Sequence, residues 1–278
     1  MRACLLLSVP FFENENNVCH TRLKTDFLRK PIEIMIVLET KNLTKQFGGL
    51  TAVNAVSMTI YQGDVVGLIG PNGAGKTTFV NAISGLNPPT SGKVILFGEE
   101  TTGLTPERMC RKGLSRTFQI PSPFPKMTAI ESVMTASIFG NDPEVVKDPM
   151  QHSREMLEFV EFPMAEDVLS EQLNTVQLKR LDLARALASH PKLLFMDELA
   201  SGLSEGELTD IMRIIHKISQ KGISILMIEH IMQLIMAVCN RLLCIQFGTK
   251  IAEGSTKEVA NDPRVTKAYL GSASDDHP

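Results

Sequence analysis

Gly70-Pro71-Asn72-Gly73-Ala74-Gly75-Lys76-Thr77-Thr78 decides the fold of this chain. The stretch fits the pattern G-x-x-x-x-G-K-[ST], with an apolar strand-like run before it (65–69) and a helix-like run after it (79–83). Glycines let backbone N–H groups approach a phosphate without a Cβ in the way, and a helix begins there with its positive dipole end. The stretch therefore predicts a phosphate-binding loop and a bound nucleoside triphosphate.

The last residues of this loop supply its polar side chains. Lys76 offers a positive charge to the β- and γ-phosphates, and the Thr77 hydroxyl can ligate Mg²⁺. The alternative interpretation is a glycine-rich turn followed by a chance Lys-Thr pair. The strand and helix patterns on either side favour the phosphate-binding loop.

A second motif, Leu193-Leu194-Phe195-Met196-Asp197-Glu198, ends an apolar strand with two carboxylates. Ligands of open α/β sheets bind at the carboxyl ends of the strands. Asp197 can hold the Mg²⁺ shell there, and Glu198 can polarise the attacking water. Two solvated acids at a strand end are the plainer alternative. In combination with the phosphate-binding loop, the motif predicts nucleotide hydrolysis.

Strands and helices are expected to alternate after Met35, which predicts an α/β fold with a mostly parallel sheet. The helical pattern in the middle of the chain, roughly 120–190, predicts an inserted helical subdomain. The expected strands are 36–39, 56–61, 64–69, 93–97, 193–196 and 223–228, and the expected helical segments are 128–169, 175–187 and 205–219.

Composition limits the class of protein. The chain has 278 residues, 43% hydrophobic and 21% charged, and a net charge of −3, so no basic field suggests a nucleic-acid partner. Its five cysteines are scattered and form no C-x-x-C pair, which is typical of a reduced compartment with buried thiols. Charged and polar residues interrupt the apolar stretch 223–247, so it should not span a bilayer.

Residues 1–34 do not fit the rest of the sequence. A short apolar segment near Leu5 hints at a signal peptide, but Pro10 breaks it and no small-residue cleavage site follows. Two explanations stay open, a disordered extension and a misassigned upstream start codon. The nucleotide-binding domain is expected to cover 35–278.

From Leu38 to Gly271 the chain resembles the nucleotide-binding subunit of an ATP-binding-cassette (ABC) transporter. The resemblance implies a P-loop NTPase fold of the ABC type, with a mostly parallel core sheet, an antiparallel β subdomain and an inserted helical subdomain. It implies ATP and Mg²⁺ as ligands. The implied ATP-binding residues are Phe47, which would stack on adenine, Val53, and the loop residues Gly70, Pro71, Asn72, Gly73, Ala74, Gly75, Lys76, Thr77 and Thr78.

The resemblance also assigns the remaining site residues. Gln119 matches the glutamine that senses Mg²⁺ and the γ-phosphate, and His230 matches the histidine that contacts the γ-phosphate. Alone, Phe47, Gln119 and His230 would be a core aromatic, a surface amide and a strand-end histidine, but all three occur in the family's order. The implied catalytic residues are Glu198, His230 and Gln119, and the implied metal-binding residues are Thr77, Gln119 and Asp197.

Within the family, the segments around Gly67, His230 and 265–271 look like the branched-chain amino acid import group, and specifically its larger ATPase subunit. Related cassettes for urea, aromatic acids and lipopolysaccharide export carry similar tails. Residues 123–133 resemble the segment that receives a permease's coupling helix. The implied partners are two permease subunits, a second ATPase subunit and, indirectly, a solute-binding protein. The implied location is peripheral, on the cytoplasmic face of the inner membrane.

Three departures from the family pattern affect the expected assembly. The signature sequence L-S-G-G-Q appears as Leu173-Asn174-Thr175-Val176-Gln177, so a branched Val176 stands where backbone should approach the partner's phosphate. Leu199 replaces the usual proline after Glu198, and Ser204 replaces the usual aspartate. These changes favour a heterodimer with a different ATPase subunit over a symmetric homodimer.

Two other functions compete with that of an import ATPase. The altered signature is compatible with a regulatory ATP-binding subunit with weak hydrolysis, although the intact Lys76, Asp197 and Glu198 argue against it. A cassette ATPase acting on DNA or ribosomes would carry coiled-coil inserts, tandem cassettes or basic patches, and the sequence has none of these. The transported solute cannot be read from this chain.

Overall fold

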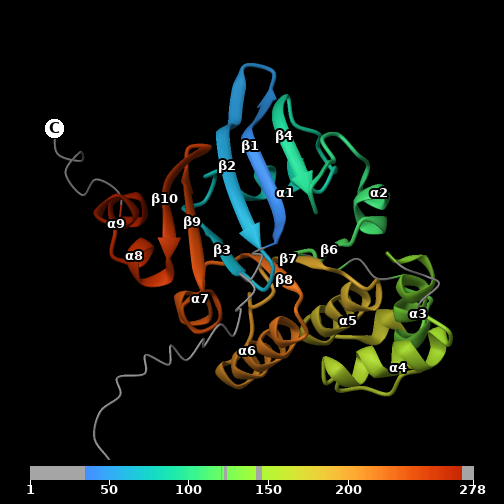
Figure 1. Cartoon of the computed structure of the whole chain (residues 1–278). Coiled ribbons are helices and arrows are strands. Elements are labelled where there is room, and N and C mark those ends of the chain that lie inside the picture. The colour runs from blue at the N-terminus through green and yellow to red at the C-terminus, as the bar shows by residue number, and fades with distance from the viewer. Residues whose placement is uncertain (1–34, 120, 122–123, 142–145, 271–278) are drawn as a thin grey trace, which may run out of the picture. The chain divides into compact units, whose positions relative to one another are not determined.

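The structure is a computed structural model that describes residues 35–119, 121, 124–141 and 146–270. The first 34 residues, for which an extension was expected, lie outside these ranges. The described strands form two sheets, one antiparallel and one mostly parallel (Figure 1). The antiparallel sheet has the order β2-β1-β4-β5 and consists of β1 (Ile36–Phe47), β2 (Leu50–Tyr61), β4 (Ser91–Leu96) and β5 (Glu99–Glu100).

The larger sheet carries the phosphate-binding loop. Its order is β10-β9-β3-β8-β7-β6, and all neighbouring strands are parallel except the β9–β10 hairpin. Its strands are β3 (Val65–Ile69), β6 (Leu114–Arg116), β7 (Leu193–Asp197), β8 (Ser224–Ile228), β9 (Arg241–Gln246) and β10 (Thr249–Ser255).

Alternate side chains of the parallel strands enter two separate cores. On β3, Val66 and Leu68 pack with helix α1 (Lys76–Ile83) and the antiparallel sheet, whereas Val65 and Ile69 pack with helices on the other face. Because successive side chains of a strand point to opposite faces, both faces of this sheet are apolar and covered. The strands β3, β7 and β8 of this sheet are therefore buried along their whole length, which fixes the ends of these strands.

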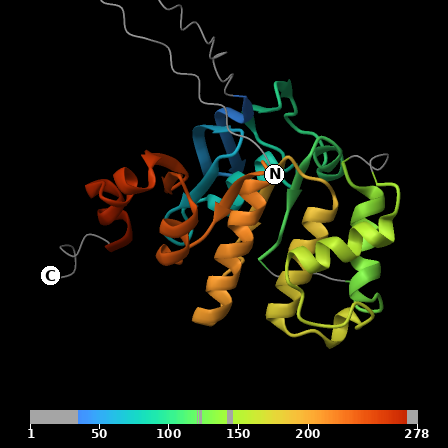
Figure 2. The same cartoon turned by 60° about the horizontal axis from the view of Figure 1, so that its bottom comes forward.

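The helices between β6 and β7 form a group beside α6 (Glu205–Gln220), as Figure 2 shows. This group contains α3 (Ala129–Phe139), α4 (Pro149–Phe159) and α5 (Thr175–Ala188). The other helices are α2 (Pro106–Arg111), α7 (Met232–Val238), α8 (Thr256–Ala260) and α9 (Pro263–Leu270), with a 3-10 turn at Ser170–Gln172. In the described ranges, no helix is both long and apolar enough to cross a membrane.

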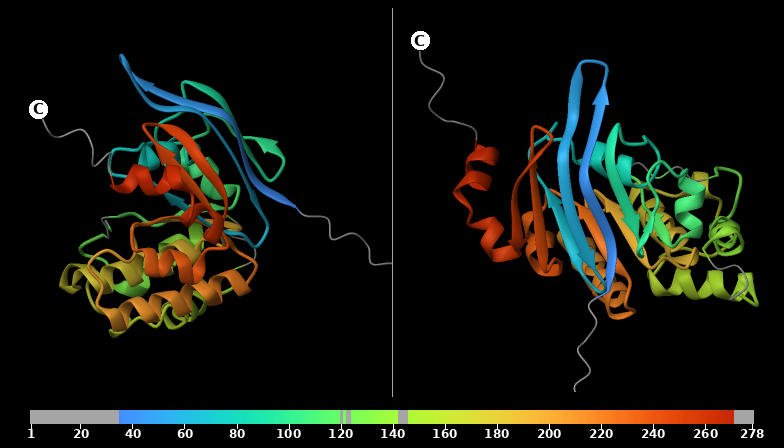
Figure 3. Two further views of the ribbon diagram at one scale, coloured as in Figure 1. Left: turned by 90° about the vertical axis from the view of Figure 1, so that its left-hand side faces the viewer. Right: turned by 45° about the horizontal axis from the view of Figure 1, so that its top comes forward.

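The predicted fold class is confirmed. Two strands are longer than expected, because β1 and β2 form a long hairpin in which β-bulges interrupt the alternation on which the prediction rested. The strands β9 and β10 were not predicted. Their hairpin lies beside β2, close to the phosphate-binding loop (Figure 3).

Candidate nucleotide-binding site

The turn between β3 and α1 requires glycine at two positions. Gly70 and Gly75 have φ values of 148° and 98°, and a Cβ on Gly75 would lie 2.4 Å from the carbonyl oxygen of Ala52. Gly75 is the N-cap of α1, and no side chain in the described ranges caps this helix. The first N–H groups of α1 therefore have no side-chain acceptor, as an anion site at a helix N-terminus requires.

A hollow of about 500 Å³ opens in front of this helix end. The phosphate-binding loop and α1 line it from one side, and the β1–β2 and β9–β10 turns line it from the other. The lining residues are Phe47, Leu50, Thr51, Ala52, Asn72, Gly73, Ala74, Gly75, Lys76, Thr77, Thr78, Glu198, Phe247 and Gly248.

Val53, which the resemblance places among the ATP-binding residues, does not line this hollow. Its side chain is fully buried in the core, while the preceding Ala52 lines the hollow. The three residues before it, Leu50, Thr51 and Ala52, line the hollow, whereas Val53 turns into the core at a point where the β1–β2 register is irregular. Phe47 does lie at the hollow, and its ring is 47% exposed.

The ammonium group of Lys76 folds back onto its own loop. Its Nζ donates hydrogen bonds to the carbonyl oxygens of Gly70 (2.7 Å) and Pro71 (3.0 Å). Burial lowers the pKa of Lys76 below its usual value, and the carboxylates of Glu198 and Asp197 oppose this shift. These two hydrogen bonds hold the ammonium group of Lys76 at the phosphate-binding loop.

Asp197 ends β7 in a buried ion pair that sequence reasoning missed. Its Oδ2 accepts a hydrogen bond from Nη2 of Arg116 at 2.6 Å, and both side chains are less than a tenth exposed. Nη1 of Arg116 donates to Oδ1 of Asn81 on α1. Arg116 therefore connects β6, β7 and the helix that follows the phosphate-binding loop.

Glu198 follows Asp197 and lies in the left-handed region, with φ 47°. Such a conformation is costly for a residue with a side chain, and it persists only where surrounding contacts impose it. Here the Glu198 N–H donates to the carbonyl oxygen of Ile228 (2.9 Å), and Oε2 accepts from Nε2 of Gln119 (2.6 Å). The structure thus brings Gln119 and Glu198 together at the hollow.

His230 is exposed, two residues beyond the end of β8, and does not line the hollow. The preceding Glu229 is buried, and its Oε1 accepts the Ala200 N–H (2.9 Å) while Oε2 has no hydrogen-bond partner among the described residues. Burial raises the pKa of Glu229. Glu229 thus links the segment after β8 to the loop after Glu198.

A second unpredicted contact joins the phosphate-binding loop to α9. The Gly70 N–H donates a 2.7 Å hydrogen bond to the hydroxyl oxygen of Tyr269. The two residues are 199 positions apart in the sequence. No local pattern connects them, so only the folded chain could show that Tyr269 anchors the start of the loop.

The segment that resembles the signature sequence lies at the N-terminus of α5, away from the hollow. Asn174 and Gln177 form a capping box, in which each side chain accepts the other residue's backbone N–H at 2.9 Å. Thr175 is exposed and Val176 is half-buried. Ser204 likewise caps α6, together with Glu207. Two of the three departures from the family pattern, those at Asn174 and Ser204, thus place helix-capping residues in this structure.

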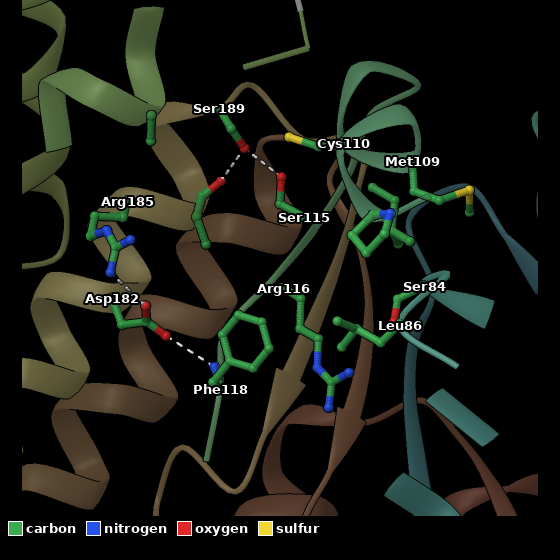
Figure 4. Close-up of a pocket in the computed structure, with 14 residues that line it drawn as sticks. Ser84, Leu86, Met109, Cys110, Ser115, Arg116, Phe118, Asp182, Arg185 and Ser189 are labelled. Carbon is green, nitrogen blue, oxygen red and sulfur yellow. Dashed lines mark hydrogen bonds and ion pairs between the residues drawn. The ribbon is translucent and has the colours of Figure 1, made fainter. Parts of the chain in front are cut away.

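A second, mainly apolar cleft of about 320 Å³ lies between the core and the helical group (Figure 4). Leu86, Met109 and Phe118 line it, and Arg116 runs along it between Leu86 and Phe118. At its edge Asp182, which is buried, accepts the Phe118 N–H at 3.0 Å. This bond fixes the segment that leads to Gln119. Of the expected docking segment 123–133, Pro123 lies outside the described residues.

Comparison with known proteins decides the family. The model described as "ABC transporter" matches residues 53–201, more than half of the chain. The chain belongs to the ABC transporter family. The predicted recognition is thereby confirmed. A second model, "Branched-chain amino acid ATP-binding cassette transporter", matches residues 249–275 of this ABC cassette.

Relatives of this ABC cassette match over nearly their whole lengths. The high-affinity branched-chain amino acid transport ATP-binding protein BraF of Pseudomonas aeruginosa is 37% identical over 251 residues, covering 85% of this chain and 98% of that protein. LivG of Escherichia coli K12, named likewise, is 33% identical over 254 residues, with coverages of 85% and 98%.

Solved structures of ABC cassettes have the same fold. A nucleotide-free cassette from an ABC transporter aligns with a TM-score of 0.77 at 32% identity, covering 85% of this chain and all of that chain. The ADP conformation of the cassette MJ1267 aligns with a TM-score of 0.76 at 32% identity, with coverages of 85% and 99%.

Proposed function

We propose that this ABC cassette is the ATP-binding and hydrolysing subunit of an importer for branched-chain or related amino acids. The names of BraF and LivG and the match at 249–275 favour this solute class over urea, aromatic acids and lipopolysaccharide. One observation carries the catalytic part of the proposal. A single hollow contains the phosphate-binding loop, Lys76 and Glu198, with Gln119 bonded to Glu198.

The residues at the hollow fit ATP with Mg²⁺. The uncapped start of α1 and the Lys76 ammonium suit a polyphosphate, and the ring of Phe47 offers a face to a base. Thr77 lines the hollow, whereas Asp197 and Gln119 do not; the hydroxyl, carboxylate and amide oxygens of these residues are hard donors, which Mg²⁺ prefers. When bound, Mg²⁺ would neutralise phosphate charge. Glu198 would then accept a proton from the attacking water, while Gln119 orients its carboxylate.

Two substitutions separate binding from hydrolysis. Lys76→Ala should lose ATP affinity, because its charge acts on the bound phosphates already in the ground state. Glu198→Gln should keep ATP affinity but lower turnover about 10²–10⁴-fold, because only water activation is removed. Binding of a fluorescent ATP analogue and phosphate release would be measured for both. Lys93→Ala, which removes an exposed lysine paired with Glu100, is the matched control. Normal turnover in Glu198→Gln would contradict the catalytic role.

Permease subunits are the proposed partners that bring this ABC cassette to the cytoplasmic face of the membrane. The apolar cleft beside Phe118 supports this assignment, because it presents apolar surface next to the segment that leads to Gln119. A bound permease helix could thus influence the residue that contacts Glu198. Co-purification with the two permeases, compared between the wild-type chain and Leu86→Asp, tests the assignment. Equal recovery of both chains would contradict it.

The second ATPase subunit is proposed to differ from this chain. In a cassette dimer each ATP lies between one subunit's phosphate-binding loop and the other's signature. Here the Asn174 side chain is used by its own capping box, and Val176 adds a branched Cβ. A donor missing from a transition-state cradle costs about 10²–10³ in rate, so this chain alone should be nearly inactive.

Mixing with a second, different ATPase subunit should restore hydrolysis. Val176→Gly in the lone chain should raise its basal rate if the branched side chain obstructs the phosphate. Thr209→Gly, on the exposed face of α6, controls for a glycine in a helix. Rapid hydrolysis by the unmixed wild-type chain, unchanged by Val176→Gly, would refute the unequal pair.

A further inference from the structure

Phe247 is the least buried of the large apolar side chains in the described part of the chain, at 83% exposure, and it lines the nucleotide hollow. It stands in the turn between β9 and β10, where Gln246 pairs with Thr249, so Phe247 and Gly248 form a two-residue loop. Their φ values are 48° and 74°. Such loops favour asparagine, aspartate or glycine at the first position, and a phenylalanine there is strained.

The β4–β5 hairpin contains the same turn and shows what normally offsets that strain. Phe97 and Gly98 form its two-residue loop, with φ values of 50° and 82°. The ring of Phe97 is partly buried against the core, and Nζ of Lys192 lies 5.6 Å from its centroid. Burial therefore explains the aromatic residue in the β4–β5 turn. Phe247 has no comparable burial in this chain.

The backbone holds the Phe247 turn against the phosphate-binding loop. The Gly248 N–H donates to the carbonyl oxygen of Ala74 (2.9 Å), and the Gly248 carbonyl oxygen accepts the Asn54 N–H (2.8 Å). One bond reaches the loop and the other reaches β2, so Phe247 has a fixed position relative to both sides of the hollow. The exposed ring of Phe47 lines the same hollow.

We propose that Phe247 is a second aromatic contact for the base of the bound nucleotide, in addition to Phe47. The proposal rests on nucleotide binding in this hollow, as argued above. Every nucleobase has a π-face, so stacking on an aromatic side chain favours bases over bare phosphate without selecting one base. Phe247 thus contributes affinity for nucleoside triphosphates of any base and contributes nothing for inorganic tripolyphosphate.

Phe247→Asn gives a test that misfolding cannot imitate. Asparagine is the preferred residue of this turn, so the variant should melt a few degrees above wild type. At the same time it should bind ATP and GTP about tenfold more weakly, while its affinity for tripolyphosphate stays unchanged. Dissociation constants would be measured by calorimetry on the full chain, and unfolding by thermal melts.

Three variants complete the experiment. Phe97→Asn changes the equivalent turn and should lower the melting temperature without changing ATP affinity. Phe139→Ala removes another highly exposed ring, 74% exposed and outside the hollow, and should change neither quantity. Lys76→Ala should lose ATP and tripolyphosphate together. Wild-type ATP affinity in Phe247→Asn, or equal losses of ATP and tripolyphosphate, would overturn the base contact while leaving the proposed ATPase intact. A wild-type chain that binds neither ligand would overturn both.

Discussion

Replacing Arg116 by methionine tests whether the buried ion pair at Asp197 holds the site together. The change keeps an apolar stem along the cleft but removes the guanidinium that bonds Asp197 at 2.6 Å and also reaches Asn81. Both ionic side chains are less than a tenth exposed, so the substitution leaves a buried, unpaired carboxylate. Such a loss destabilises a protein by about 3–5 kcal/mol. For a chain of this size we expect the melting temperature to fall by about 10 °C.

The assay is thermal unfolding of Arg116→Met, Asp197→Asn and the double variant. Removing both charges removes the unpaired carboxylate, so the double variant should be markedly more stable than the sum of the single effects predicts. Arg154→Met is the matched control. It breaks an ion pair with Glu166 in which both side chains are at least 41% exposed, and it should melt near the wild-type temperature. Additive effects of the two single changes, or an Arg116→Met variant as stable as the control, would refute the reasoning.

Three further predictions concern other parts of the chain. A chain beginning at Met35 should unfold near the wild-type temperature and keep its ATPase activity, and loss of either would show that residues 1–34 contribute. Tyr269→Phe removes the acceptor of the Gly70 N–H and should cost about 1 kcal/mol, measured by thermal melts against Tyr61→Phe. The raised pKa of Glu229 means that the folded state binds its proton more tightly than the unfolded state. Wild-type stability should therefore rise, relative to Glu229→Gln, as the pH falls from that raised pKa toward 4.5, and parallel pH profiles would contradict this.

The sequence predicts those features that depend on local patterns. The loop Gly70–Thr78 and the strand ending at Asp197 are continuous motifs, and each was placed correctly on its element. A motif does not state which of the neighbouring residues Ala52 and Val53 faces the hollow, and in the structure Ala52 lines it. A bulge-containing hairpin makes that assignment depend on the pairing register.

Contacts between distant segments could not be predicted. Arg116 meets Asp197 across 81 positions, and Tyr269 meets Gly70 across 199. An arginine in an apolar segment predicts only a buried or snorkelling cation, and its partner follows from the strand order of the folded sheet. Phe247 belongs to a pattern that is visible in the sequence, an aromatic residue directly before a glycine. The same pattern occurs at Phe97, which packs against the core. Only the exposure of each ring in the folded chain distinguishes Phe247 from Phe97.

The place of β3 in its sheet determines when the nucleotide site can form during protein synthesis. Val65 pairs with Ile225 on β8, and Val66 pairs with Arg241 on β9, although both partners are translated long after β3. A nascent chain that has produced only the phosphate-binding loop and α1 therefore has no neighbours for the strand that positions them. Non-local pairing of this kind slows folding and leaves strand edges open. The nucleotide site can therefore form only after β9 has left the ribosome. Chains that end before β9 should remain unfolded and be bound by chaperones or degraded by proteases.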